Sequence, residues 1–257
     1  MGDSFLLFAL VGFLAQLVDG ALGMAYGVVS STVMLSFGVS PAVASATVHA
    51  AEVFTTGASA ASHIAHRNVD WRLFRRLVPA GVIGGLIGTY VLTSFDGAVL
   101  RPWVVGYLGL MGVYILYRSN HRPDPYHEHS RAAVVGLGST GGFVDAVGGG
   151  GWGPVVTTGL IGAGGAPRQV IGTVNAAEFL LTVAVSAGFL IALLTGHWDQ
   201  EKALVDHAMA VAGLVAGGVL AAPLAGYVTR ILPHRVAMVL VGLLICTLAA
   251  YQLLRLL

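Results

Sequence analysis

The sequence predicts an all-α polytopic membrane protein with two homologous halves that are arranged as inverted repeats. Three observations predict this fold. Charged residues make up 10% of the 257-residue chain, hydrophobic residues 56%, and the mean hydropathy is +0.82, whereas soluble domains carry about 25% charge. Apolar segments cover nearly the whole length, which leaves no room for a separate soluble domain. Residue patterns of the first half also return 126 positions later in the second half.

The first apolar segment, about 4–37, does not read as a simple membrane span. A straight helix of this length would measure roughly 50 Å, well beyond the ~30 Å hydrocarbon core. Its middle, QLVDGALGMAYGVVSS at Gln16–Ser31, holds a carboxylate and several glycines. We therefore expect a helix that breaks between Asp19 and Met24 and turns back, with two arms of about 14 residues, each roughly 20 Å long.

A second broken segment, about 132–163, repeats this design. Its centre reads GFVDAVGGGGWGPVVT at Gly142–Thr157. The matching pairs are Asp19 with Asp145, Gly23 with Gly149, Tyr26 with Trp152, Gly27 with Gly153, and Ser31 with Thr157. In transporters built from internal repeats, paired broken helices mark the substrate site near the bilayer midplane.

Three predicted membrane helices follow each broken segment. In the first half they span about 42–65, 77–95 and 99–117, with Pro41 opening the first of them. In the second half they span about 169–195, 203–228 and 236–257, and Pro167 matches Pro41. The predicted repeats are thus residues 1–120 and 132–257, joined by a polar linker at 121–131.

Basic loops set the expected orientation. The stretch His66–Arg76, which reads as a loop, and the linker are both rich in arginine, so both are expected on the cytoplasmic side. Re-entrant broken segments then give each half three crossings, invert the halves and place both termini outside. Full crossings of the broken segments would instead move the Arg230–Arg235 loop outside, which the charge rule disfavours.

Ionisable side chains within membrane spans are rare and usually functional. Besides the two aspartates, they lie in two matching helix segments, TVHAAEVF at Thr47–Phe54 and TVNAAEFL at Thr173–Leu180. The matching pairs are Thr47 with Thr173, His49 with Asn175, and Glu52 with Glu178. Both glutamates fall roughly 15 Å into their helices, near the midplane.

The broken helices suggest how this region binds a ligand. The second arm of each begins near the glycines, and a helix N-terminus attracts anions through its free N–H groups and its partial positive charge. Two such ends could hold an anion without a Lys or Arg. The substrate-binding candidates are the paired residues of the breaks (Asp19, Gly23, Tyr26, Gly27, Ser31, Asp145, Gly149, Trp152, Gly153, Thr157) and of the helix segments (Thr47, His49, Glu52, Thr173, Asn175, Glu178).

Each candidate also has a purely structural interpretation. Asp19 and Asp145 are equally well explained as caps of the second arms. Glu52 and Glu178 are either proton carriers or hydrogen-bonded structural clamps, and His49 is either a proton-coupling group or a core histidine. Tyr26 and Trp152 either shape the cavity or pack. The sequence indicates neither a cofactor nor a metal site: Cys246 is the single cysteine, and the linker histidines read as a solvated connector.

At these residues the chain resembles the sulfite exporter TauE/SafE family of membrane permeases. The resemblance covers essentially the whole chain: two related halves, each with a V-D-G/A…Y/W-G element, a proline and a T-V-H/N-A-A-E helix. It implies a multi-pass protein of the cytoplasmic membrane that transports small sulfur-containing anions such as sulfite, thiosulfate or organosulfonates, with protons as the expected coupling ion.

The function expected from the sequence is therefore a secondary transporter that works by alternating access around a midplane site. An anion channel that uses the same helix ends is the alternative. An enzyme is not expected, because the chain has neither a G-x-S-x-G nor an H-E-x-x-H motif. The expected partners are a small anion, lipid and protons. The net charge of +1 indicates no nucleic-acid partner, and the oligomeric state is left open.

Overall fold

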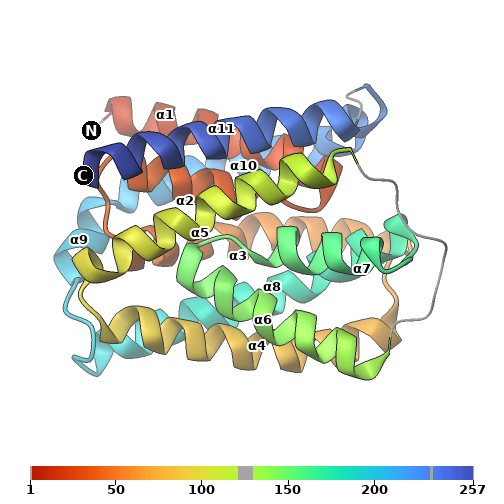
Figure 1. Cartoon of the computed structure of the whole chain (residues 1–257), viewed down its shortest axis with the longest axis horizontal. Coiled ribbons are helices and arrows are strands. Elements are labelled where there is room, and N and C mark those ends of the chain that lie inside the picture. The colour runs from red at the N-terminus through yellow and green to blue at the C-terminus, as the bar shows by residue number, and fades with distance from the viewer. Residues whose placement is uncertain (1, 121–129, 232–233, 257) are drawn as a thin grey trace.

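In the computed structural model the chain is a bundle of roughly parallel and antiparallel helices (Figure 1). The structure describes residues 2–120, 130–231 and 234–256. Its elements are α1 Gly2–Leu22, α2 Tyr26–Ser36, α3 Pro41–Ala65, α4 Trp71–Ser94, α5 Gly97–Arg118, α6 Arg131–Gly148, the π-helical turn η1 Gly153–Thr157, α7 Thr158–Gly162, α8 Pro167–Leu194, α9 Glu201–Asp206, α10 Ala208–Ile231 and α11 His234–Leu256. Most of the predicted linker lies outside the described residues.

The composition of these helices fits a membrane. Within the described residues, four helical stretches are long and apolar enough to cross one: Trp71–Ser94, Gly97–Arg118, Pro167–Leu194 and Met238–Leu256. Shorter apolar helical stretches cover Phe5–Asp19, Tyr26–Ser36, Gly153–Gly162 and Ala208–Ala222. The all-helical, polytopic fold class is thereby confirmed.

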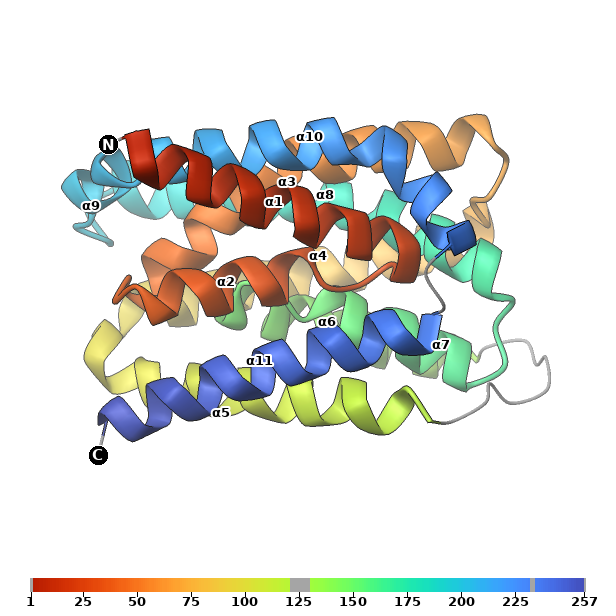
Figure 2. The ribbon, with the colours of Figure 1, turned by 90° about the horizontal axis from the view of Figure 1, so that it is seen from above.

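Both broken segments are present, and each turns back on itself. In Figure 2, α1 and α2 run antiparallel, so that α2 ends near the side from which α1 started. The segment from α6 to α7 turns back in the same way but opens toward the opposite end of the bundle (Figure 1). The N- and C-termini lie together at one end (Figures 1 and 2).

The arms are less equal in length than the sequence suggested. The first helix has 21 residues and runs on to Leu22, whereas α2 has only 11. The helical hydrogen bond from the Gly23 N–H to the Asp19 carbonyl, 2.6 Å, carries the first arm past Asp19. The break therefore falls at 23–25, where Gly23 takes a φ of 65° and Ala25 a φ of 143°.

Two other boundaries differ from the prediction. His66–Arg76 is not all loop, because α4 begins at Trp71: the Asp70 carboxylate accepts the N–H groups of Arg72 and Leu73 at 2.8 and 3.2 Å. Such an N-cap satisfies donors that a helix start leaves open. The span predicted from residue 203 is divided, with the short α9 preceding α10.

Glycines on α4 and α10 let neighbouring helices approach closely. A Cβ on Gly84 or Gly88 of α4 would collide with backbone carbonyls of α6, those of Ser139 and Phe143. On α10, a Cβ on Gly213 or Gly217 would collide with the backbone of α1. Each broken segment thus packs its first arm against a helix of the other half, and the halves interlock.

Equivalent elements of the two halves contact each other. After α1 with α10 and α4 with α6, the largest contacts join α3 to α8 and α5 to α11. The hydroxyl groups of Thr56 and Thr182, which are 126 positions apart, lie 3.5 Å from each other. Equivalent residues of the two halves thus meet where α3 packs against α8.

Candidate functional site

The tips of the two broken segments meet beside α3 and α8. The Ser31 hydroxyl donates to the Gly149 carbonyl at 2.5 Å, and the Thr157 hydroxyl donates to the Gly23 carbonyl at 2.9 Å. The two bonds are equivalent: in each, a hydroxyl group of one half donates to the carbonyl of the matching glycine in the other half. The predicted pairs Gly23 with Gly149 and Ser31 with Thr157 therefore tie one tip to the other.

Glycine is required where the tips touch. A Cβ on Gly27 would lie 2.8 Å from the Gly149 carbonyl oxygen, and one on Gly153 would lie 2.5 Å from the Cα of Met24. Gly149 also adopts a φ of 65°, a left-handed conformation that side chains disfavour. The Gly150 carbonyl accepts a bond from the Tyr107 hydroxyl of α5 at 3.3 Å, which fixes the second tip from outside.

Each aspartate bridges its own break. Asp145 lies in the last turn of α6, and its Oδ1 accepts the N–H groups of Gly151 and Trp152 at 2.7 and 2.9 Å. Asp19, in the last turn of α1, accepts the Tyr26 N–H at 3.3 Å. The capping interpretation is thus correct in substance, although the cap reaches across the break from the first arm. Donors at both helix ends are consequently already occupied by carboxylates.

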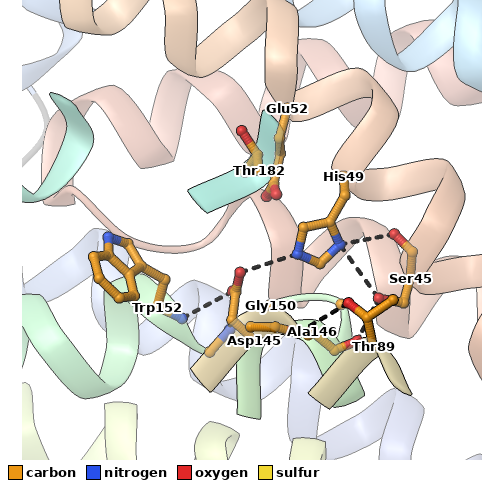
Figure 3. A network of polar contacts seen from close by, with 12 residues as sticks. Ser45, His49, Glu52, Thr89, Asp145, Ala146, Gly150, Trp152 and Thr182 are labelled. Carbon is orange, nitrogen blue, oxygen red and sulfur yellow. Dashed lines mark hydrogen bonds and ion pairs between the residues drawn. The ribbon is translucent and has the colours of Figure 1, made fainter. Parts of the chain in front are cut away.

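His49 joins the second break to α3. Its Nδ1 lies 2.8 Å from the Ser45 carbonyl oxygen, and its Nε2 lies 3.0 Å from Oδ2 of Asp145 (Figure 3). A carbonyl only accepts, so Nδ1 carries a hydrogen. The Nε2–Oδ2 contact needs one more hydrogen, which the pair shares. Ser45 also donates to the Ala146 carbonyl at 2.5 Å, which fastens α3 to α6.

The second half has no equivalent of this pair. Asn175, which matches His49, donates from Nδ2 to the Ile171 carbonyl at 3.0 Å and accepts the Ser59 hydroxyl at 3.1 Å. Its first contact copies that of His49 with the Ser45 carbonyl, at the equivalent position 171. The two halves therefore share this backbone contact and differ in the side chain that makes it, an imidazole in one half and an amide in the other.

Glu52 is buried without a partner for one of its oxygens. The side chain is 2% exposed, and Oε2 lacks a hydrogen bond. Figure 3 shows its carboxyl group pointing toward the space beside Asp145. Burying a polar atom without a hydrogen-bond partner costs on the order of 1–3 kcal/mol of folding free energy, so such an atom in a native structure calls for an explanation.

That space is a small cavity between the two tips. Its walls are backbone at the breaks and four carboxyl groups: Asp19, Ala25, Gly27, Val28, Glu52, Asp145, Gly150, Gly151, Gly153, Pro154 and Glu178. None of these lining residues is Lys or Arg. The cavity has room for about one water molecule, so in this conformation it is closed to any polyatomic anion.

The structure divides the sequence-derived candidates into three groups. Six line the cavity: Asp19, Gly27, Glu52, Asp145, Gly153 and Glu178. Six support it through the bonds described above: Gly23, Ser31, His49, Gly149, Thr157 and Asn175. The remaining four lie elsewhere: Tyr26 donates to the Leu214 carbonyl, Trp152 to the Val174 carbonyl, Thr173 accepts the Asp70 N–H, and the buried Thr47 hydroxyl has no partner.

Some site residues were missed by the sequence analysis. Ala25, Gly150 and Gly151 line the cavity because the breaks lie a few residues beyond the aspartates. Ser45 orients His49 but has no polar equivalent, since Ile171 occupies its place in the second half. Thr56 and Thr182 were detectable, because they share their residue type at the repeat distance of 126.

Comparison with known proteins agrees with this architecture. The family model described as sulfite exporter TauE/SafE matches residues 8–252. The chain is 44% identical over 243 residues to the probable membrane transporter protein YtnM of Bacillus subtilis (strain 168), covering 92% of this chain and 78% of that protein. No solved structure matches. With a match across nearly its full length, this chain belongs to the sulfite exporter TauE/SafE family of membrane transporters.

Proposed function

We propose that this protein is a proton-coupled secondary transporter of small sulfur-containing anions, such as sulfite, thiosulfate or organosulfonates, in the cytoplasmic membrane. The family's printed name supports the substrate class. The observation that supports the proposal is the cavity between the two helix tips, which four carboxyl groups line and where Asp19 and Asp145 already accept N–H groups of the breaks.

The charges around this cavity link anion binding to protons. Asp19, Glu52, Asp145 and Glu178 would repel an anion if all were ionised, and no Lys or Arg among the lining residues offsets them. A protonated carboxyl group instead donates an O–H to an oxyanion. Anion occupancy therefore requires protons on these groups, and release of the anion frees them.

Glu52 and Glu178 are the proposed proton carriers. Asp145 has both oxygens engaged, with the tip N–H groups and with His49, and Asp19 holds the other tip. Glu52 has a buried oxygen free to bind a proton or an anion. Its equivalent, Glu178, faces the same cavity from α8.

Alternating access is the proposed mechanism. The broken segments open toward opposite ends of the bundle (Figure 1), which supports an inverted arrangement of the halves. Rocking of one half against the other would then widen the cavity first toward one side and then toward the other. The closed cavity corresponds to an intermediate between these two states.

Flux into proteoliposomes tests the proposal. We expect uptake of radiolabelled sulfite, thiosulfate or sulfoacetate to rise with an inwardly directed proton gradient. Glu52→Gln, which keeps the shape but cannot exchange a proton, should reduce gradient-driven uptake at least tenfold and preserve anion exchange. Asp199→Asn, which removes an exposed carboxylate outside the cavity, is the matched control and should behave as wild type.

The outcomes also separate a transporter from a channel. Flux that ignores the proton gradient, together with conductance in planar bilayers, would identify an anion channel through the same site. Absence of flux for all three anions in folded protein would contradict the proposal.

A further inference from the structure

A hollow opens at the end of the bundle that carries both termini. It encloses about 980 Å³, part of it open to solvent. Its walls include Ser40, Pro41, Ala42, Arg101, Trp198 and Leu256, that is, the start of α3 together with the ends of neighbouring elements. The hollow therefore lies directly above the first turn of the helix that carries His49 and Glu52.

One face of α3 leads from this hollow to the central cavity. Ala42 lines the hollow, Ser45 follows one turn deeper, and His49 follows one turn below Ser45. Residues spaced by three or four positions share a helix face. Glu52 continues the same face into the central cavity. The distance along α3 from Ala42 in the hollow to Glu52 in the cavity is thus nearly three helical turns, roughly 15 Å.

Two aromatic side chains fill the space along this path. Trp198 lines the hollow, and its ring centroid lies 5.4 Å from that of Phe189. The Phe189 ring centroid lies 6.4 Å from that of His49. Both side chains are almost fully buried, with 6% of Trp198 and 3% of Phe189 exposed. The rings are tilted against one another, at 49° between Trp198 and Phe189 and 50° between Phe189 and His49, and they connect the hollow with the His49–Asp145 pair.

The opposite end is closed in another way. There the loop between α3 and α4 is bonded onto the start of α8: Arg168 Nε donates to Asn68 Oδ1 at 2.7 Å, and the Asp70 N–H donates to the Thr173 hydroxyl at 2.8 Å. A Cβ on Gly172 would lie 2.5 Å from the Asn68 carbonyl oxygen, so loop and helix are in direct contact. His63 occupies the position equivalent to Phe189, and its Nδ1 lies 3.2 Å from Nδ2 of Asn68.

We propose that Phe189 and Trp198 are the gate through which a small anion passes between the hollow and the central cavity. That an anion passes this gate rests on the transport function proposed above. That the two aromatic side chains block access from the hollow to Ser45 does not depend on that function. Opening this gate needs rotation of two side chains, whereas the other end is held by the loop contacts with α8 described above. The end with the termini also has polar contacts between elements, Ser94 Oγ with His197 Nε2 at 2.9 Å and Arg101 with the Leu35 and Gly38 carbonyls at 2.7 and 3.3 Å, but these do not involve the rings of Phe189 or Trp198.

Cysteine accessibility tests the gate without measuring transport. In a Cys246→Ser background, Ser40→Cys, at a half-buried position that lines the hollow, reports on the hollow, and Ser45→Cys reports on the space deeper along α3. The probe is the small anionic reagent 2-sulfonatoethyl methanethiosulfonate. We expect rapid labelling of Ser40→Cys, slow labelling of Ser45→Cys, and at least tenfold faster labelling of Ser45→Cys after Phe189→Ala or Trp198→Ala.

A third aromatic residue provides the matched control. Phe95 lines the same hollow but is 58% exposed at its rim, so Phe95→Ala should leave Ser45→Cys labelling slow. Unchanged rates of Ser45→Cys labelling in both gate variants, in protein whose Ser40→Cys still reacts at the original rate, would overturn the gate. Equally rapid labelling of Ser45→Cys with both aromatics in place would overturn it as well.

A flux measurement separates failure of the gate from failure of the proposed function. Exchange of labelled for unlabelled sulfite across proteoliposomes without a proton gradient should be several-fold faster for Phe189→Ala than for Phe95→Ala. Accelerated labelling without flux of any anion would retain the gate and refute anion transport. Gradient-driven anion flux in protein whose Ser45→Cys labelling is unchanged by the gate variants would retain anion transport and refute the gate.

Discussion

At the scale of single residues, the two aspartates occupy equivalent positions in the repeat but make different numbers of hydrogen bonds. Asp145 satisfies two backbone N–H groups and His49, whereas Asp19 accepts one N–H at 3.3 Å. Removal of a buried acceptor costs the desolvation of every donor it leaves behind. The two positions are therefore natural controls for each other.

This difference predicts unequal losses of stability. Asp145→Ala should lower the free energy of unfolding by about 3–5 kcal/mol, because it strands two N–H groups and a buried histidine. Asp19→Ala should cost about 1–2 kcal/mol. Asp145→Asn should be mild, since an amide can accept from the N–H groups and donate to His49 Nε2. Thermal unfolding in detergent ranks the variants, and equal losses for both alanine variants would contradict this account.

The residue types and their recurrence predicted much of the candidate site, and the contacts that they did not predict have physical reasons. Recurrence of Asp19, Glu52 and their equivalents at equal depth predicted the groups that line the cavity. The His49–Asp145 contact could not be predicted, because it joins residues 96 positions apart and has no copy in the other half. Tyr26 and Trp152 recur as well, yet their polar atoms bond to backbone carbonyls away from the cavity.

At the scale of elements, the sequence predicted some helix boundaries correctly and misplaced others. Pro41 and Pro167 correctly predicted the starts of α3 and α8, since proline suits the first helical turn. The start of α4 was placed too late, because the arginines near it suggested a loop while the cap at Asp70 begins a helix. Local charge is thus a weaker guide to helix boundaries than the chemistry of the helix end.

Glycine packing between elements can be tested by paired substitutions. Gly217 of α10 lies against the Ala9 carbonyl of α1, so an added methyl has no space. Gly217→Ala should lower the free energy of unfolding by about 1–3 kcal/mol through overpacking. Gly106→Ala, on α5 with nothing within 4 Å of the added Cβ, should be neutral or slightly stabilising. Comparable melting temperatures for the two variants would show that α1 and α10 can separate without cost.

At the scale of the whole molecule, the fold follows from two helical segments that break and turn back. Each broken segment brings a helix end into the bundle and then runs back toward the end from which it started (Figures 1 and 2). Backbone groups at such breaks are tolerated in a bilayer only where protein or a cavity satisfies them. Here the exchanged hydroxyl bonds and the two aspartates do so. The same contacts that stabilise the breaks thereby form the site.

This arrangement predicts that equivalent residues face opposite sides of the membrane. Phe37 follows α2, Ala163 follows α7, and the two are 126 positions apart with exposed side chains. In a Cys246→Ser background, an impermeant maleimide added outside intact cells should label Phe37→Cys and not Ala163→Cys, while inside-out vesicles should give the opposite pattern. The physical reason is that a segment which turns back cannot change sides, so halves separated by an odd number of crossings are inverted. Labelling of both positions from one side would show that at least one broken segment crosses fully, and the cavity between the tips would then need a different account.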